Sequence, residues 1–239
     1  MTTPVFRENP MQSILEAQVI AHTPEGGIVC DQSIFYPTGG GQPGDSGQLL
    51  LDGQVWDVAT TVKGEGDQIV LVPAEPKPLP PIGSAVQQRL DWGRRMSHMR
   101  VHTALHLLSV VLPLPVTGGA IGEGKGRLDF LMPEPPSDKQ AIEDAVNALI
   151  DQKLQVSDEW ITEAELDENP EMVKTMSVQP PRGSGRIRLV RIGEGDRTVD
   201  LQPCGGTHVA NTGEIGRIRI GKIENKGKQN RRVNLLLEA

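Results

Sequence analysis

The chain has 239 residues, of which 37% are hydrophobic and 23% are charged, and its formal net charge is −7. This length allows one or two domains with a real core, and the composition is typical of a soluble globular protein. No apolar stretch approaches the ~20 residues that a membrane helix requires, and the first residues lack the pattern of a secretion signal. Two cysteines cannot form a disulfide framework, so we expect a cytoplasmic protein with no membrane partner.

Charge is distributed unevenly along the chain. Residues 1–181 hold 12 Lys and Arg against 25 Asp and Glu, whereas residues 182–232 hold 12 against 5. The acidic balance of the whole chain argues against general nucleic-acid binding. A basic C-terminal quarter favours a single face that contacts a polyanion.

The first part of the chain, residues 1–90, predicts a small β-barrel-like or sandwich domain, because no helical period longer than a turn or two occurs there. The dipeptide Asp52-Gly53 favours a type I′ hairpin turn between two strands. A proline-rich stretch at 72–83 predicts an extended connector, and we place the domain boundary just beyond it, near Leu90. The expected strands are 13–22, 27–31, 48–51, 54–58 and 69–72.

A glycine-rich segment, FYPTGGGQPGDSG at residues 35–47, lies between these strands. Its consecutive glycines, Gly39, Gly40 and Gly41, let the backbone approach a ligand closely. Thr38 and Gln42 add polar side chains on either side of them. An ordinary flexible turn has a similar composition, so the segment alone leaves a binding loop and a plain turn both open.

The second part, residues 91–239, predicts an α+β domain with two long helices on an antiparallel or mixed sheet. Asp91 is the expected N-cap of a helix that must end before Pro113. Ser137 followed by Gln140 resembles a capping box at the start of the second helix. The expected strands are 186–192, 198–201, 215–223 and 232–237, with residues 204–208 in a loop after one of them.

Two pairs of metal-ligand residues share a four-residue spacing. His102 and His106 would leave one face of the first helix together, and Cys204 and His208 repeat the spacing about a hundred residues later. One cysteine and three histidines form a common zinc shell, so we predict one zinc ion per chain. A Cys30 to Cys204 disulfide is the less favoured alternative, because it would remove a sulfur from this site. A closed four-ligand shell would also suit a purely structural zinc.

Four motifs carry a resemblance to a known family. FYPTGGGQPGDSG, HMRVHTALHLL, PCGGTHVANTGEIG and ENKGKQNRRV follow one another in the order and at the separations found in the AlaX alanyl-tRNA editing proteins. They are also similar to the editing domain of alanyl-tRNA synthetase. The resemblance covers residues 35–237, and the N-terminal β domain with its glycine-rich loop resembles the medium-length AlaX form.

The resemblance implies an ATP-independent hydrolase that removes a wrong amino acid, serine or glycine, from the acceptor end of alanine tRNA. By its place relative to the family's threonine, Thr117 is the expected residue for recognising the serine hydroxyl, with Thr103 as second candidate. Gln42 would position a water or the aminoacyl group, since a neutral amide cannot be a strong base. Asp200 could accept a hydrogen bond from a ligating histidine. His98 is expected to be exposed or to face the tRNA.

Basic residues of the last strands are the expected phosphate contacts. Seven cations surround a single carboxylate, Glu224, in this segment: Arg217, Arg219, Lys222, Lys226, Lys228, Arg231 and Arg232. Together with the glycine-rich loop, Thr38 to Gly41, they would hold the tRNA, and no obligate protein partner is inferred. A non-catalytic tRNA-binding module, in which zinc only joins a helix to a loop, remains an alternative to the enzyme.

Overall fold

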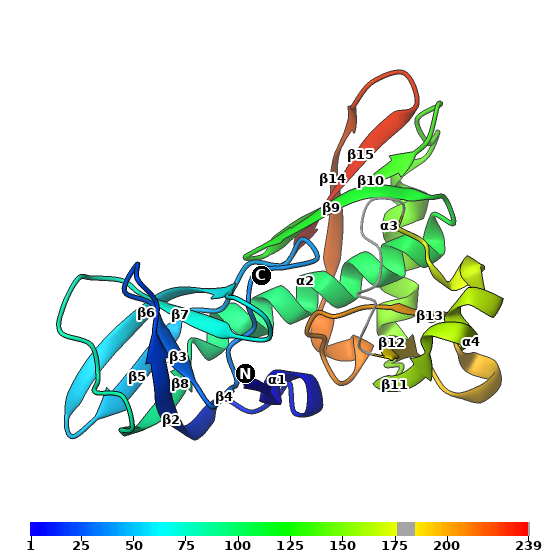
Figure 1. Cartoon of the computed structure of the whole chain (residues 1–239). Helices are drawn as coiled ribbons and strands as arrows, with labels where there is room; N and C mark the ends of the chain where they lie inside the picture. Colours follow the sequence, from blue (N-terminus) through cyan, green and yellow to red (C-terminus); the bar gives the residue numbers. More distant parts are fainter. Residues whose placement is uncertain (176–184, 239) are drawn as a thin grey trace. The chain divides into compact units, whose positions relative to one another are not determined.

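The computed structural model describes residues 1–175 and 185–238, and the chain divides into two compact units, Met1–Met96 and Ser97–Ala239 (Figure 1). Helix α2, Trp92–Val111, begins in the first unit and continues in the second. Over the described part of the chain, no helix has the length and apolar character needed to cross a bilayer.

The first unit is built around a closed six-stranded barrel with the strand order β2-β3-β7-β6-β5-β8, which confirms the predicted β-barrel-like fold. Apolar side chains such as Val19, Leu49 and Trp56 fill its core. A short pair of parallel strands, β1 and β4, and the single turn of helix α1 accompany it. The elements are β1 (Thr3–Pro4), α1 (Val5–Glu8), β2 (Ile14–His22), β3 (Ile28–Cys30), β4 (Gln32–Ser33), β5 (Gly47–Leu51), β6 (Gln54–Lys63), β7 (Ile69–Pro73) and β8 (Ala85–Leu90).

The hairpin between β5 and β6 turns at Asp52 and Gly53, as predicted. Their φ angles are 47° and 79°, and positive φ at both central residues is the mark of a type I′ turn. The turn fixes the register of the hairpin, in which Leu51 lies opposite Gln54.

Strand β8 closes the barrel and was missed by the sequence analysis. It pairs with β2 on one side and β5 on the other. Alternate residues Val86, Gln88 and Leu90 are buried, but the polar Gln88 interrupts the apolar alternation that marks a strand. The fold compensates for its burial, because the Gln88 side chain accepts from the backbone N–H of Ile34 and donates to the carbonyl of Gln32.

The second unit combines two antiparallel sheets with two long helices, which confirms the α+β class. One sheet has the order β14-β15-β10-β9 and the other the order β11-β12-β13. The strands are β9 (Val116–Gly122), β10 (Lys125–Leu131), β11 (Val156–Thr162), β12 (Arg186–Ile192), β13 (Asp200–Pro203), β14 (Ile218–Asn225) and β15 (Asn230–Leu237). The other elements are α3 (Lys139–Asp151), α4 (Glu163–Glu168), and the 3-10 turns η1 (Pro170–Met172), η2 (Gly195–Arg197) and η3 (Thr212–Ile215).

Three strands of this unit were not predicted. Strand β9 contains Gly118 and Gly119, which weaken any strand signal, whereas β10 and β11 carry charged residues between their apolar ones. Pairing with neighbouring strands stabilises segments whose own sequence only weakly favours a strand. For example, β10 lies between β9 and β15 and forms a continuous antiparallel ladder with β15.

Helix caps confirm one prediction and correct another. The Asp91 side chain accepts a hydrogen bond from the backbone N–H of Arg94 at 3.1 Å, so Asp91 caps α2 as expected. The predicted capping box of Ser137 and Gln140 is wrong, because Asp138 is the N-cap of α3 and accepts from the backbone N–H of Ala141. An ionised carboxylate at the helix N-terminus also interacts favourably with the helix dipole.

Glycine at position 126 lets α2 pack closely on β10. A Cβ atom there would lie 2.5 Å from Val101 and 3.1 Å from Leu105, so any larger residue would push the helix away. Val101 and Leu105 therefore form the sheet-facing side of α2. The neighbouring side presents His102 and His106, one residue further along the chain in each case.

Candidate metal centre

Four potential metal ligands converge in the second unit. His102 and His106 come from α2, whereas Cys204 and His208 come from the loop after β13, and their ligand atoms all lie within 4.8 Å of one another. The Nε2 atoms of His106 and His208 are 3.2 Å apart. The Cys204 sulfur lies 3.4 Å from His102 Nε2 and 3.6 Å from His208 Nε2. The two pairs that share a spacing in sequence are thus brought together in space.

The spacing of these atoms fits a tetrahedral ion. With metal–nitrogen and metal–sulfur bonds of about 2.0 to 2.3 Å, the ligand atoms of a tetrahedral site lie about 3.3 to 3.7 Å apart. Two of the observed distances, 3.4 and 3.6 Å, fall within this range, and the third, 3.2 Å, lies just below it. Imidazole nitrogen and thiolate sulfur are ligands for metals such as zinc rather than for calcium or magnesium. The group can therefore hold a metal ion.

Asp200, in β13, orients one of the four ligands. Its Oδ2 lies 2.8 Å from His106 Nδ1, as the sequence analysis suggested for a carboxylate at this position. Burial raises the pKa of Asp200, but the hydrogen bond and charge of His106 and the charge of Lys174 lower it to about 2. Because an ionised carboxylate can only accept, Nδ1 must carry the hydrogen. In the neutral ring that binds a metal, the lone pair then lies on Nε2, which is 3.2 Å from Nε2 of the ligand His208.

The surroundings of Cys204 and His208 favour the protonation states in which these side chains bind a metal. Burial raises the pKa of the Cys204 thiol, but the imidazoles of His102 and His208 lower it by more, so the pKa lies well below its usual range. Burial lowers the pKa of His208 to about 3, which keeps that imidazole neutral. Burial also disfavours charge on His106, yet Asp200 and Cys204 raise its pKa to about 9, so this imidazole must release a proton when it binds a metal. A thiolate and a neutral imidazole are the forms that bind metals.

Arg188, in β12, holds the loop that carries Cys204, and sequence reasoning did not identify it. Its Nη1 donates to the carbonyls of Cys204 at 2.9 Å and Gly206 at 3.1 Å. Its side chain is only 8% exposed and also lies 3.4 Å from a carboxylate oxygen of Asp158. No signal in the sequence singles it out, because β12 carries three arginines, Arg186, Arg188 and Arg191, between its apolar residues.

Sequence comparison gives the family. The chain is 35% identical to the Alanyl-tRNA editing protein AlaX-M of Methanosarcina acetivorans and 36% identical to AlaX-M of Methanosarcina barkeri, over 93% of both chains in each case. It is also 36% identical to an Alanine--tRNA ligase of Methanothrix thermoacetophila, matching 93% of this chain and 24% of the ligase. Residues 187–234 match the family described as Threonyl and Alanyl tRNA synthetase second additional domain.

The chain belongs to the AlaX alanyl-tRNA editing proteins. The resemblance found in the four motifs is thereby confirmed. Within this AlaX protein, the matched segment 187–234 contains the loop pair Cys204 and His208, whereas the helix pair lies outside it.

The two threonines considered for substrate recognition differ in how their hydroxyls are used. Thr103 is buried, donates to the carbonyl of Met99 at 2.9 Å and accepts from the backbone N–H of Val209 at 3.3 Å. It therefore ties α2 to the segment after His208. Thr117 is half-buried at the start of β9, where its hydroxyl lies 3.1 Å from the Asp129 carbonyl and 3.3 Å from Asn230 Oδ1.

The remaining histidines, His98 and His22, lie outside the group of four ligands. His98 is 1% exposed, so the prediction that it is exposed is wrong. It stands one helical turn before His102 and shares the buried side of α2. His22 is half-buried, and its Nε2 lies 2.9 Å from the Pro80 carbonyl, in keeping with a structural residue.

The glycine-rich loop of this AlaX protein is an ordered turn of the first unit. The Thr38 hydroxyl donates to the Thr61 carbonyl at 3.2 Å and accepts from the backbone N–H of Gly44 at 2.9 Å. Gly39 and Gln42 exchange two backbone hydrogen bonds, while Gly40 and Gly41 have φ angles of 57° and 81°. Positive φ at two successive positions explains the run of glycines between Thr38 and Gln42, and the Gln42 side chain is buried.

The predicted phosphate contacts fall into two groups on the β14 and β15 hairpin (Figure 1). Five of the seven are exposed, namely Arg217, Arg219, Lys222, Lys226 and Lys228. Arg232 is instead held by Asp129, with Nε and Nη2 at 2.8 and 2.9 Å from the carboxylate. Arg231 is half-buried and donates to backbone carbonyls, including that of Pro133 at 2.5 Å. The lysines are therefore more accessible to a polyanion than these two arginines.

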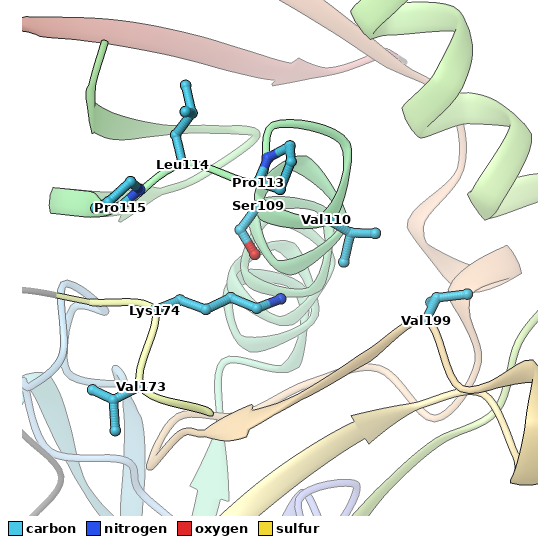
Figure 2. A pocket seen from close by; sticks show the side chains of 8 residues that line it. All are labelled: Ser109, Val110, Pro113, Leu114, Pro115, Val173, Lys174 and Val199. Atoms are coloured by element: carbon cyan, nitrogen blue, oxygen red, sulfur yellow. The ribbon is translucent and has the colours of Figure 1, made fainter. Parts of the chain in front are cut away.

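A pocket of about 580 Å³ lies one turn beyond His106 along α2. In Figure 2 the hydroxyl of Ser109 and the long side chain of Lys174 extend into the space between α2 and the segment that carries Val199. Its walls are otherwise apolar and come from Val110, Pro113, Leu114, Pro115, Val173 and Val199.

Proposed function

We propose that the protein hydrolyses the ester bond that joins serine, and also glycine, to alanine tRNA after the charged tRNA has left its synthetase. Membership of the AlaX family supports the substrate, and the convergent group of His102, His106, Cys204 and His208 carries the proposed chemistry. We further propose that the protein works in the cytoplasm without an obligate protein partner. Residues 1–90 and 91–239 would form its barrel domain and its editing domain.

The need for such an activity follows from the limits of a binding pocket. A pocket that accepts alanine also admits glycine, which is smaller, and rejects serine poorly because serine adds only a hydroxyl. A second site that binds the serine hydroxyl through a hydrogen bond discriminates strongly, since an unmatched buried polar group is costly. Serine esters are then removed while alanine esters survive.

We propose zinc, one ion per chain, as the metal that the four ligands hold. The donor set and the spacing of the ligand atoms support this choice. When bound, zinc supplies a positive charge that can orient the ester or polarise a water. The protein contributes the rest: Asp200 holds His106 in the form whose Nε2 is free of hydrogen, and Arg188 holds the carbonyls of the Cys204 loop.

Three residues are proposed to act on the aminoacyl group itself. Gln42 would position a water or the aminoacyl group through its amide, without acting as a base. Thr117 would recognise the serine hydroxyl, because its half-buried hydroxyl oxygen still has acceptor capacity. Thr103 is the second candidate, although its hydroxyl already donates to Met99 and accepts from Val209.

The tRNA is proposed to lie along the basic hairpin and the glycine-rich loop. Lys222, Lys226 and Lys228 would neutralise phosphates, with Arg231 and Arg232 nearby, and Thr38 to Gly41 would contact the acceptor end. Replacing Lys226 and Lys228 together with Gln should reduce the dependence of log Kd on log salt by about one to two. Filter binding at several salt concentrations measures this slope, and an unchanged slope would place the phosphate contacts elsewhere.

Deacylation of serine-charged alanine tRNA tests the proposed function. The purified protein should release serine from serine-charged alanine tRNA. It should release glycine from glycine-charged alanine tRNA at the same rate or more slowly, and it should leave alanine-charged tRNA intact. His106→Ala, checked to be folded by circular dichroism, provides the matched inactive protein. Ester loss no faster than in buffer would refute the enzyme.

A non-catalytic tRNA-binding module is the second candidate, because four protein ligands can form a closed structural shell. That module would bind the same tRNA without hydrolysing it. It would also unfold when His106 is replaced, whereas the enzyme would lose turnover and keep its fold.

A further inference from the structure

We propose that Lys174 is a positioning residue for the metal centre and acts through Asp200 on the imidazole of His106. The inference rests on the proposed metal site, and Lys174 is not one of the four ligands. It follows η1 in the chain and lies outside every motif that the sequence analysis used.

Asp200 is the junction of a hydrogen-bonded chain that ends at the metal ligands. Its Oδ1 accepts from Lys174 Nζ at 2.5 Å, and its Oδ2 accepts from His106 Nδ1 and from Gln202 Nε2, both at 2.8 Å. Each oxygen therefore has a defined donor. Gln202 in turn lies 3.4 Å from the hydroxyl of Ser109, so the carboxylate is also held from the side of α2.

The positive charge of Lys174 also stabilises the Asp200 carboxylate, beyond the hydrogen bond that it donates. The Asp200 side chain is 0% exposed, and a buried carboxylate requires a cationic partner. Once His106 Nε2 binds a metal, its ring with a hydrogen on Nδ1 is a neutral ligand. The ammonium of Lys174 then supplies the full positive charge that contacts Asp200, and it keeps the carboxylate aimed at Nδ1.

The backbone of Lys174 is fixed independently of its side chain. Its carbonyl accepts a hydrogen bond from the backbone N–H of Val116 at 3.0 Å, and Thr175 forms a parallel bridge with Val116. Val116 is the first residue of β9 and precedes Thr117, the residue proposed to recognise the serine hydroxyl. Lys174 therefore connects the start of β9 to the ligand His106 through its own side chain and that of Asp200.

The side chain of Lys174 is accessible enough to be replaced without creating a sealed cavity. It is 30% exposed and lines the pocket described above, with its far end near Ser109 (Figure 2). Methionine at this position keeps most of the apolar stem and removes the ammonium. Arginine keeps the charge, and glutamine keeps a hydrogen-bond donor without it.

Metal affinity, measured by chelator competition with Zn²⁺ on the full chain, tests this role. Loss of a residue that supports a metal ligand typically weakens binding by about 10 to 100-fold, so we expect about a tenfold higher Kd for Lys174→Met. Lys174→Gln should fall between the parent and Lys174→Met, and Lys174→Arg should restore most of the affinity. Lys139→Met, at an exposed position of α3, is the matched control and should bind as the parent does.

Co²⁺ provides a second readout that a purely structural role would not change. The visible absorption of bound Co²⁺ reports on ligand geometry, and its bands should shift in Lys174→Met but not in Lys139→Met. A Kd and a Co²⁺ spectrum equal to the parent's in Lys174→Met, with weaker binding in Asp200→Asn, would overturn the inference while leaving the metal site intact. Failure of the parent itself to bind either ion would overturn both the inference and the proposed metal site.

Discussion

Two buried ion pairs on the same helix show how this protein separates structure from function. Near the start of α2, Arg95 pairs with Asp45 in the first unit, with side chains 0% and 2% exposed. Eleven residues later, His106 pairs with Asp200 in the second unit, with side chains 7% and 0% exposed. Both pairs join a helical cation or imidazole to an aspartate from a distant part of the chain.

In the Arg95 pair, every nitrogen of the guanidinium has a hydrogen-bond partner within the protein. Arg95 donates through Nε to both oxygens of Asp45 and through its other two nitrogens to the carbonyls of Pro10 and Ile34, at 3.0 and 2.6 Å. Asp45 also accepts from the backbone N–H of Tyr36 at 2.6 Å. A guanidinium that is satisfied in this way stabilises its surroundings and has little left to offer a ligand.

The His106 pair engages only one of the two ring nitrogens. Nδ1 faces Asp200, whereas Nε2 faces other ligand atoms and lies 3.2 Å from His208 Nε2. Two imidazole nitrogens and a thiolate at such distances gain more from a shared cation than from one another. A buried polar group whose hydrogen bonds are all made within the chain has a structural role. A buried ring nitrogen that faces other ligand atoms instead indicates a metal site.

The largest effect that this comparison predicts is at Cys204. Cys204→Ala should reduce bound metal from about one ion per chain to nearly none and abolish deacylation, because the thiolate is the only anionic ligand of the four. Metal analysis after dialysis against a chelator measures the loss. The matched control is Cys30→Ala, since burial raises the pKa of that barrel thiol to about 12 and makes it unreactive. Full metal occupancy in Cys204→Ala would remove Cys204 from the site.

Breaking the Arg95 pair should affect stability rather than metal. Arg95→Met leaves the Asp45 carboxylate buried without its counter-ion, and we expect a loss of about 3 to 5 kcal/mol in the free energy of unfolding. Urea denaturation measures it, and the double variant Arg95→Met with Asp45→Asn should recover part of the loss. The folded fraction should still bind one metal ion per chain. Loss of metal from folded Arg95→Met would contradict the assignment of a purely structural role to the Arg95 pair.

A third pair, half-buried on the four-stranded sheet, should matter least. The hydrogen bond from Arg232 and the charge of Arg127 hold the pKa of Asp129 below its usual value, against the opposing effect of burial. A lowered pKa stabilises the fold above the unfolded pKa of about 4, and this contribution is lost as pH falls through the folded pKa.

Asp129→Asn should therefore cost about 1 kcal/mol or less at pH 7, and the difference from the parent should shrink in acid. Urea midpoints at neutral and acidic pH measure the two differences. A gap that widens as the pH falls would contradict the assigned sign.

Local sequence predicted the features that depend on neighbouring residues. The Asp52-Gly53 turn, the Asp91 cap and the end of α2 before Pro113 all follow from the backbone preferences of a few residues. The capping-box prediction failed by one position, because Ser137 and Asp138 are both good N-caps and only packing selects between them.

Pairing between distant segments could not be predicted in the same way. Strand β8 has a buried Gln88 and β9 has consecutive glycines, so neither shows the alternation of an isolated strand. Each is stabilised by the strands beside it, which supply hydrogen bonds that no local pattern records. His98 was misplaced for a related reason, since helical spacing gives a common side but not whether that side is buried.

By itself, the sequence determined the α+β class, the family and the two ligand pairs, because turn chemistry, motif order and four-residue spacing are encoded within short segments. Only the tertiary structure decided that the two pairs meet, that Asp200 contacts His106, and that Arg188 and Lys174 contact the Cys204 carbonyl and Asp200 respectively. These contacts join residues up to about a hundred positions apart. Their geometry depends on the contacts that β10 and β13 make with α2, and such contacts between distant segments produce no periodic pattern in the sequence.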